Sequence, residues 1–275
     1  MNIIELKYSS TNTYIIQGDK GCILFDTGLA GTFCSFLREL GEKGLKAQNI
    51  DYILISHFHP DHMGIAELIA ELGPKIMIAD FQKDFVHGYD DVIMRDPHTE
   101  FKPVDDSKVV CASAESMAEI LCKLGINSHI FHTPGHSDDS LSLLVNGEYL
   151  FVGDLNPLYE LELHKGTKIG KSWDMLLSLN PAVVYYGHAK AAILREVNIS
   201  QAQQVEADVQ EHKNDDLCKL VSRIMKYIDK GYSIDKIHKK TKADITFIND
   251  VARMYLTHQN VSVQGILDRI EIKGR

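Results

Sequence analysis

Residues 56–62 read Ser-His-Phe-His-Pro-Asp-His and follow directly on the apolar stretch 52–55. Three imidazoles and a carboxylate this close together are difficult to explain as packing. Clustered histidines repel one another when protonated and need hydrogen-bond partners when neutral. A divalent cation removes both difficulties, because neutral imidazole nitrogens and carboxylate oxygens are suitable ligands for zinc and its borderline neighbours. Pro60 helps to turn the chain, so alternate side chains can face two metal positions. The stretch therefore predicts a metal site after a buried strand.

Three further motifs place a histidine or an aspartate at the end of an apolar strand. Thr133-Pro134-Gly135-His136-Ser137 follows a strand predicted at 129–131, Asp154 ends a hairpin strand, and Gly187-His188 follows a strand predicted at 182–186. Glycine lets the backbone approach closely at such points. Each motif alone is weak, since a single residue of this kind is usually a cap or a solvated loop residue. Together with residues 56–62, they indicate one site.

Short β-branched runs closed by turn residues dominate the first 190 residues, which is typical of strands. Hairpins are predicted around residues 18–21 and around Asn146-Gly147. The second strand of each hairpin delivers an aspartate, Asp26 or Asp154, followed by a loop. This echo predicts two similarly built halves. Helical patterns lie between the strands, so we expect an α/β protein. They include a helix with Ser172 as its cap and the apolar series Ile65, Leu68, Ile69 and Leu72.

Residues 81–108 form a polar, aperiodic segment that is too long for a simple connector. A binding loop and a solvated surface excursion are both consistent with this pattern.

The sequence is helical in pattern from about residue 198 onward. Ser233 is predicted to cap a helix over 234–240, between two other short helical segments. The first of these has an apolar series at helix spacing, formed by Leu217, Leu220, Val221, Ile224, Met225 and Ile228. Three short helices with tight turns predict a compact unit, loosely helix-turn-helix in shape.

Composition limits the class of protein. The 275 residues carry a net charge of −9, which argues against a protein whose main task is to hold nucleic acid. Residues 216–275 contain 12 Lys and Arg against 7 Asp and Glu, so two regions with different tasks are indicated. The five cysteines are scattered without a CxxC pair, and the apolar runs are too short to span a bilayer. We expect a soluble, cytoplasmic protein with reduced thiols.

The motifs HFHPDH, TPGHS, VGDL and YGH, preceded by FDTG, resemble the successive motifs of the metallo-β-lactamase superfamily. The resemblance spans roughly residues 1–190. It implies a four-layer αβ/βα sandwich, with two mixed sheets face to face and a metal site at one edge. We therefore expect a metallo-β-lactamase-like catalytic domain over residues 1–200 and a helical, helix-turn-helix-like domain over residues 201–275.

The resemblance also implies a ligand set. The first metal would be held by His57, His59 and His136. The second would be held by Asp61, His62 and His188, with Asp154 bridging the pair. Asp26 would lie outside these ligands as a hydrogen-bond partner. We expect two divalent cations, zinc in the first place and iron or manganese as alternatives.

The expected chemistry is that of a metal-dependent hydrolase. Two dications, two aspartates and a bridging hydroxide leave a site of about +1, which suits a substrate oxygen that gains negative charge. Metal-bound hydroxide would attack, and Asp61 would help to orient it. Tyr159 and Lys190 are candidate substrate contacts.

The motif set is most similar to the glyoxalase-type thioesterases and the lactonases, so the expected small-molecule substrate is an ester, a thioester or a lactone. A mononuclear-iron sulfur dioxygenase, a phosphodiesterase and a non-enzymatic regulator with a nucleic-acid-binding tail remain alternatives. The helical tail is expected to cap the active site or to support a homodimer.

Overall fold

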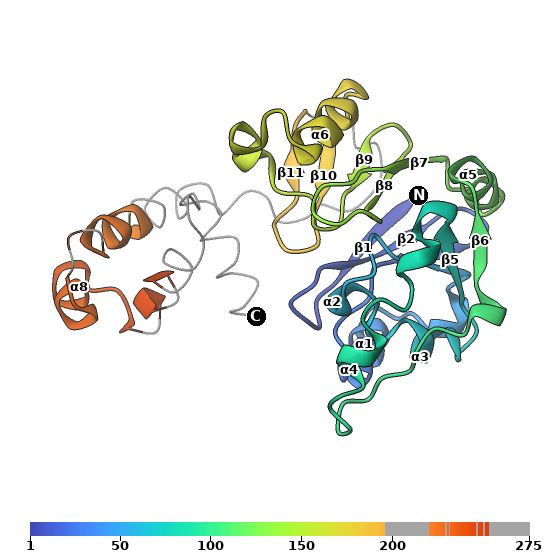
Figure 1. The fold of residues 1–275 in the computed structure, drawn as a ribbon, viewed down its shortest axis with the longest axis horizontal. Helices are drawn as coiled ribbons and strands as arrows, with labels where there is room; N and C mark the ends of the chain where they lie inside the picture. The colour runs from blue at the N-terminus through green and yellow to red at the C-terminus, as the bar shows by residue number, and fades with distance from the viewer. Residues whose placement is uncertain (196–219, 229, 231, 246, 250, 253–275) are drawn as a thin grey trace. The chain divides into compact units, whose positions relative to one another are not determined.

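The computed structural model describes residues 1–195, 220–228, 230, 232–245, 247–249 and 251–252 (Figure 1). The chain divides into two units, one comprising Met1–Pro157 with Leu163–Asn198 and the other Leu158–Glu162 with Ile199–Arg275. The predicted boundary near residue 200 lies outside the described residues and stays a prediction.

The first unit contains a six-stranded sheet in the order β1-β2-β3-β4-β5-β6. β1, β2 and β3 pair antiparallel, whereas β3 to β6 run parallel. Its strands are β1 (Asn2–Leu6), β2 (Thr13–Gln17), β3 (Cys22–Phe25), β4 (Tyr52–Leu54), β5 (Lys75–Ala79) and β6 (Val110–Ala112).

A second sheet of five strands has the order β11-β10-β9-β8-β7. β9 and β10 are parallel, and the other pairs are antiparallel. Its strands are β7 (Ser128–His132), β8 (Leu141–Val145), β9 (Tyr149–Phe151), β10 (Val183–Tyr185) and β11 (Ala192–Ile193). Asn146 and Gly147 between β8 and β9 both have positive φ, as a type I′ hairpin turn requires. Each sheet thus contains a hairpin whose second strand pairs parallel with the next, as the predicted echo requires.

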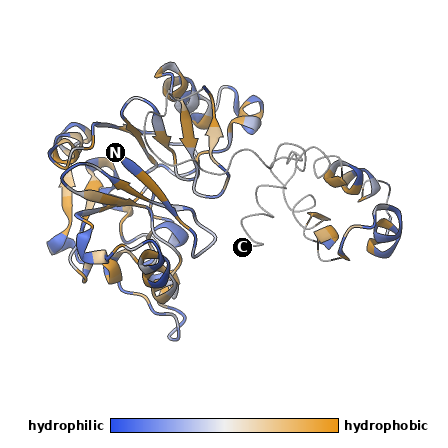
Figure 2. Ribbon diagram, turned by 180° about the vertical axis from the view of Figure 1, so that it is seen from behind, coloured by the Kyte–Doolittle hydropathy of each residue, from blue (hydrophilic) through white to orange (hydrophobic). Residues whose placement is uncertain are grey.

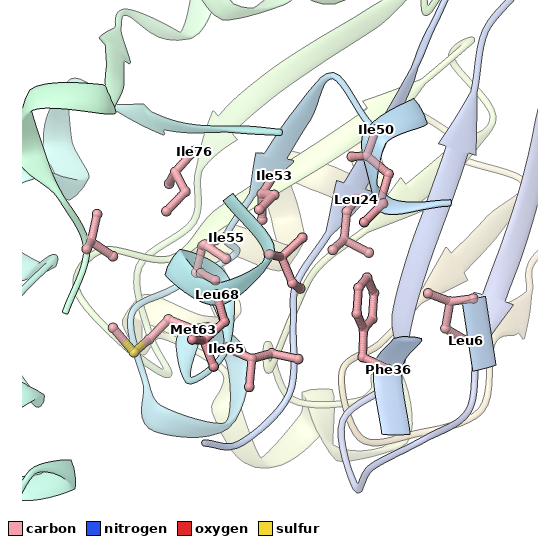
Figure 3. Close-up of a cluster of buried hydrophobic side chains, with 14 of the residues drawn as sticks. Leu6, Leu24, Phe36, Ile50, Ile53, Ile55, Met63, Ile65, Leu68 and Ile76 are labelled. Carbon is pink, nitrogen blue, oxygen red and sulfur yellow. The ribbon is translucent and has the colours of Figure 1, made fainter. Parts of the chain in front are cut away.

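Successive side chains of a strand point to opposite faces of the sheet, so this unit has two hydrophobic clusters. Ile23, Phe25 and Leu54 join Leu143 and Phe151 in the cluster that contains residues of both sheets. The other cluster lies on the opposite face of the first sheet (Figure 3) and includes Leu6, Leu24, Phe36, Ile53, Ile65, Leu68 and Ile76. Figure 2 shows the hydrophobic colour concentrated on the strands, whereas the helices are mixed.

Helices cover both outer faces of this pair of sheets. On the first sheet, α1 (Phe33–Glu42) and α3 (Ala66–Ala70) supply buried residues to the outer cluster. On the second, Leu150 and Val184 are fully buried although their neighbours Phe151 and Tyr185 face the shared core. The helix α6 (Lys168–Ser178) lies on this side, because its buried Trp173 ring is 6.3 Å from the ring of Tyr186, which follows β10. The predicted α/β sandwich is confirmed.

The predicted helix cap at Ser172 is wrong. Helix α6 begins four residues earlier, and its N-cap is Thr167, whose hydroxyl accepts a hydrogen bond from the Gly170 amide. Ser172 is an interior residue of α6, and its hydroxyl donates to the Pro134 carbonyl at 2.9 Å. The hydroxyl therefore ties α6 to the loop that carries His136.

Short helical segments complete the described chain. They are η1 (Ala47–Asn49), α2 (Pro60–Met63), η2 (Asp80–Phe85), α4 (Asp90–Ile93), η3 (Asp106–Lys108), α5 (Ala114–Lys123), η4 (Leu158–His164) and α8 (Ile234–Thr241). Among the described residues, no helix has the length and apolar character needed to cross a membrane.

The second unit has a hydrophobic cluster of its own, formed by Val221, Ile224, Ile237, Ala243, Ile248 and Val251. The predicted cap of α8 at Ser233 is confirmed, because its hydroxyl accepts from the Lys236 amide. Residues 220–228 are helical, as their apolar spacing predicts, whereas Leu217 lies outside the described residues.

We expect Phe151→Ala to lower the free energy of unfolding by about 3–5 kcal/mol. The Phe151 ring is fully buried in the cluster shared by the two sheets, with its centroid 4.7 Å from that of Tyr185. Urea unfolding measures the change. Ile193→Ala, at a side chain that is 76% exposed, is the control and should change stability by less than about 0.5 kcal/mol. Equal losses in both variants would contradict the assignment of the core.

Candidate metal centre

Three imidazoles converge at the edge of the sandwich. His57 and His59 follow β4, and His136 follows β7 of the other sheet. His59 Nδ1 lies 2.9 Å from His57 Nε2 and 3.0 Å from His136 Nε2. These nitrogens form a group, here called the histidine group, that is suited to hold one metal ion.

A second group, here called the mixed group, contains Asp61, His62, Asp154 and His188. Its ligand atoms all lie within 4.8 Å of one another. His188 Nε2 is 2.8 Å from Asp61 Oδ2, and His62 Nε2 is 3.2 Å from Asp154 Oδ1. Asp61 and His62 project from α2, directly after Pro60, whereas Asp154 follows β9 and His188 follows β10.

Asp154 lies between the two groups. Its Oδ2 is 3.6 Å from His136 Nε2 of the histidine group and 3.4 Å from His188 Nε2 of the mixed group. The structure thus brings together all seven residues that the sequence motifs indicate, and Asp154 has the position of a bridging carboxylate.

Two atoms of the mixed group fit a metal ion better than they fit a protein interior. Within the described chain, the buried atoms His62 Nε2 and Asp154 Oδ1 face each other at 3.2 Å, but neither makes a hydrogen bond of good geometry. An unsatisfied buried polar atom is costly, and a cation placed between these two would satisfy both. The donor set of imidazoles and carboxylates therefore fits a divalent cation.

Burial and charge set the protonation of the ligands. Burial lowers the pKa of His57 well below its ordinary value and also lowers the pKa of His136. Both imidazoles are therefore neutral, which is the form that binds metal. Burial acts to raise the pKa of Asp154, but the imidazoles of His62 and His188 hold it well below its usual range. The bridging carboxylate is thus ionised.

Asp26 supports both groups from behind, where the resemblance placed it. Its buried carboxylate accepts from His62 Nδ1 at 2.9 Å, from the Ser56 amide at 2.6 Å and from the Ser56 hydroxyl at 2.8 Å. The same hydroxyl lies 3.0 Å from His57 Nδ1. Partners of this kind fix the ring orientation of metal-ligating histidines. Ser56, for which the sequence analysis gives no role, therefore links Asp26 to the histidine group.

Gln82 and Asp139 connect the loops that carry the three imidazoles. The buried Gln82 amide donates to the Ile55 carbonyl at 2.9 Å and to the Asp139 carbonyl at 3.2 Å. The Asp139 carboxylate accepts from the Phe58 amide at 2.7 Å. The loop after β4 and the loop after β7 are therefore held together by buried hydrogen bonds. A buried amide in a polar segment gives little signal in one sequence, so the role of Gln82 was not predicted.

The loop before β2 holds the mixed group. The His188 Nδ1 atom lies 2.8 Å from the Ser10 carbonyl, and the Thr11 hydroxyl donates to the Asp61 carbonyl at 2.8 Å. The Asn12 amide donates to the Gly187 carbonyl at 2.7 Å. These contacts join segments that are far apart in the chain, and nothing in the local sequence indicates them.

Gly187 allows the mixed group to close. A Cβ atom at this position would lie 2.5 Å from Asp154 Oδ1 and 2.7 Å from His62 Cε1. Both distances are far below van der Waals contact. The glycine of the YGH motif is therefore required by the approach of two ligand side chains.

Residues 81–108 contribute one ring to the site. The Tyr89 ring lies 5.3 Å from that of His59, and the two planes are inclined by 88°. Beside it, His87 contacts two carboxylates, with Nδ1 2.6 Å from Asp90 Oδ2 and Nε2 3.0 Å from Asp106 Oδ1. His87 therefore has partners that its sequence neighbourhood did not indicate, and it ties α4 to η3.

Other candidate residues stay where the sequence analysis left them. Lys190 is exposed two positions after His188, and Tyr159 lies in a stretch that groups with the second unit. Their assignment as substrate contacts remains a prediction. His132 contacts the Asp138 carbonyl and is not in either group.

This fold and these two groups define a metal-binding α/β sandwich protein. Residues 7–188, well over half of the chain, match the family described as the metallo-beta-lactamase superfamily. The chain belongs to that superfamily.

Individual relatives are distant. The chain is 29% identical to the beta-lactamase-like protein 2 homolog of Drosophila melanogaster over 68% of this chain and 61% of that protein. It is 26% identical to an atrochrysone carboxyl ACP thioesterase of Claviceps purpurea over 54% of this chain and 41% of that protein. The chain thus spans less than two thirds of either relative.

A metallo-beta-lactamase family protein from Thermus thermophilus has a similar fold. The TM-score is 0.53 at 19% identity, over 70% of this chain and 74% of that one.

We expect Gly187→Ala to reduce bound metal, because the added methyl group displaces Asp154 and His62. Elemental analysis of the purified protein measures the loss. Gly41→Ala is the matched control, since a Cβ at Gly41 meets nothing within 4 Å. Full metal content in Gly187→Ala would show that the two ligand side chains have room to move.

His87 makes a pH-dependent contribution to stability. The hydrogen bond to Asp90 raises the pKa of His87 above 6.5, although burial acts in the opposite direction. A group whose pKa is higher in the folded protein stabilises the fold fully at pH values below its unfolded-state pKa. This stabilisation is lost as the pH rises through the folded-state pKa. At pH 5.5 we expect the free energy of unfolding of wild type to exceed that of His87→Ala by about 1 kcal/mol or less, because the side chain is half-exposed. By pH 9 we expect this difference to vanish.

Urea unfolding at the two pH values measures this difference. Val92→Ala, at an exposed side chain of the same segment that does not titrate, is the control and should show no such change between pH 5.5 and 9. A difference for His87→Ala that grows with pH would contradict the assigned charge state.

Proposed function

We propose that the chain is a dinuclear metal-dependent hydrolase that acts on an ester, a thioester or a lactone. The observation that carries this proposal is the position of Asp154 between two complete groups of ligand atoms. A mononuclear centre held by His57, His136 and Asp154 alone would not require the mixed group. The presence of four suitable side chains in that group favours two cations.

The cations expected here are zinc, with iron and manganese as alternatives. When bound, such cations supply Lewis acidity, which lowers the pKa of coordinated water to about 7 and polarises a carbonyl oxygen. His57, His59 and His136 would hold one of them. The other would be held by Asp61, His62 and His188, with Asp154 shared.

Asp61 is the residue assigned to the catalytic step. Burial acts to raise its pKa, but the hydrogen bond from His188 and the charge of His62 lower it below the ordinary value. Its carboxylate is therefore ionised at neutral pH and accepts hydrogen bonds. Asp61 Oδ2 lies 2.8 Å from His188 Nε2 and 3.7 Å from His62 Nε2, so it is placed within the mixed group to orient the attacking water by accepting a hydrogen bond.

The proposed substrate class has two supports. Acyl transfer places negative charge on a carbonyl oxygen, which suits a cationic site. Relatives named as thioesterases match this chain, although the match covers less than half of their length. Asp154 stands where a true β-lactamase would typically present a cysteine as a ligand, so a β-lactam is not the proposed substrate. We expect a small-molecule substrate, with Tyr159 and Lys190 as further contacts, and a cytoplasmic protein that forms homodimers.

Elemental analysis of the purified full-length chain tests the metal centre. We expect about two metal ions per chain in wild type. In His57→Ala we expect about one at most, because the histidine group loses the most buried of its three ligands. His129→Ala, at an exposed histidine of β7, is the matched control and should keep both.

A panel of a thioester, a lactone, a carboxylic ester and a phosphodiester tests the reaction. Hydrolysis of an acyl substrate should fall by at least about 100-fold in His57→Ala. Removing a residue that only hydrogen-bonds to a metal ligand costs up to about 100-fold, and His57 is itself a proposed ligand. One iron per chain would support the dioxygenase alternative, and activity on the phosphodiester alone would identify a phosphodiesterase. A wild-type protein that binds no metal would refute the proposal.

A further inference from the structure

The side of the site from which substrate can enter is defined by the exposure of its ligands. His57 and His62 are almost completely buried. In contrast, the side chains of Asp61, His136 and His188 are 28%, 31% and 33% exposed. A substrate therefore approaches from the side on which these three residues lie.

The two groups differ in what borders them on the outside. The mixed group is bordered by the polar loop before β2, where Ser10 and Thr11 contact His188 and Asp61. The histidine group is bordered by an aromatic ring, because Tyr89 lies edge to face with His59. Both His59 and Tyr89 are partly exposed. An acyl group bound at the histidine group would thus lie beside an aromatic surface.

The Tyr89 side chain has capacity for a further partner. Its hydroxyl makes no hydrogen bond to any of the residues that the structure describes. A buried tyrosine hydroxyl usually finds a partner in the protein, so a free one is typical of a ring that faces solvent or a ligand.

The position of Tyr89 is fixed by its own segment. Its carbonyl accepts from the Val92 and Ile93 amides at the start of α4. Ile93 packs against the outer core of the first sheet, and His87 joins α4 to η3 through Asp90 and Asp106. The backbone that carries the ring is therefore fixed before a ligand binds, which reduces the entropy cost of binding.

The surroundings of Tyr89 favour an uncharged group. Val92 and Met94 on the same segment are 51% and 49% exposed. Asp90 is paired with His87, whereas the exposed Asp91 leaves a negative charge on the segment that would repel an anionic group. A neutral, flat apolar group is the chemistry that fits these side chains.

We propose that Tyr89 is a specificity-determining residue, which packs its ring against an aromatic acyl group of the substrate. The proposal rests on the metal-dependent acyl hydrolysis proposed above and adds to it the substrate class. It assigns a role in substrate binding to one residue of the 81–108 segment.

Two carboxylates that represent product acids test the assignment without catalysis. Calorimetry with the metal-loaded full-length chain compares phenylacetate with acetate, which share the carboxylate and differ in the ring. We expect wild type to bind phenylacetate about three- to tenfold more tightly, the range of one aromatic contact. Tyr89→Phe should keep this preference. Tyr89→Ala should abolish it and leave the affinity for acetate unchanged.

Elemental analysis of each variant separates the possible failures. A Tyr89→Ala protein that has lost metal would show that Tyr89 only supports His59, and would overturn the proposal. Tyr89→Leu, which keeps apolar volume without the ring, replaces Tyr89→Ala if that variant does not fold. A preference for phenylacetate that survives in a metal-loaded variant without the ring would also overturn it. Wild type without metal would instead refute the metal centre itself.

Discussion

The site depends on the fixed alignment of two sheets. His57, His59, Asp61 and His62 follow a strand of the first sheet, whereas His136, Asp154 and His188 follow three strands of the second. Hydrogen bonds between the sheets hold this alignment at the metal edge, including Leu141 amide to Ser56 carbonyl and Asn12 amide to Gly187 carbonyl, both 2.7 Å. The shared hydrophobic cluster, with Phe25 and Phe151 in contact, holds it in the interior. A shift of one sheet against the other would therefore separate the ligands of both groups.

Without a metal ion such a site costs free energy, because it brings five imidazoles and two carboxylates together in a partly buried place. Charge pairing reduces the cost in the mixed group. There, Asp154 and Asp26 outweigh burial and raise the pKa of His62 well above its ordinary value. In the histidine group the same problem is solved by neutrality, since burial lowers the pKa of His57. The two groups thus reduce this cost by different physical means, and a cation would reduce it in both.

The sequence predicted those features that local chemistry determines. Residues 56–62 indicated the site, turn residues placed both hairpins, and the strand predicted at 182–186 contains β10. The β1, β6 and β11 strands were missed. β6 and β11 have only three and two residues, too few to show the alternation that marks a strand. Ser172 was misread as a cap, since Thr167, five residues earlier, takes that role. Gln82, Asn12 and Tyr89 were missed for a different reason. Their roles arise from contacts between segments far apart in the chain, and one sequence carries no record of such contacts.

The repeated hairpin supplies two aspartates, Asp26 and Asp154, that have different roles at the site. Each half ends a hairpin strand with an aspartate, Asp26 or Asp154. Asp26 adopts a positive φ of 61°, which turns its carboxylate back toward Ser56 and His62, so it is enclosed by protein donors. After β9, the Val152 amide donates to the Tyr185 carbonyl as the Asp26 amide donates to the Leu54 carbonyl after β3. Gly153 then takes the positive φ, and Asp154 comes two residues after Val152, where it faces both ligand groups. A displacement of two residues thus separates a carboxylate that supports ligands from one that bridges them.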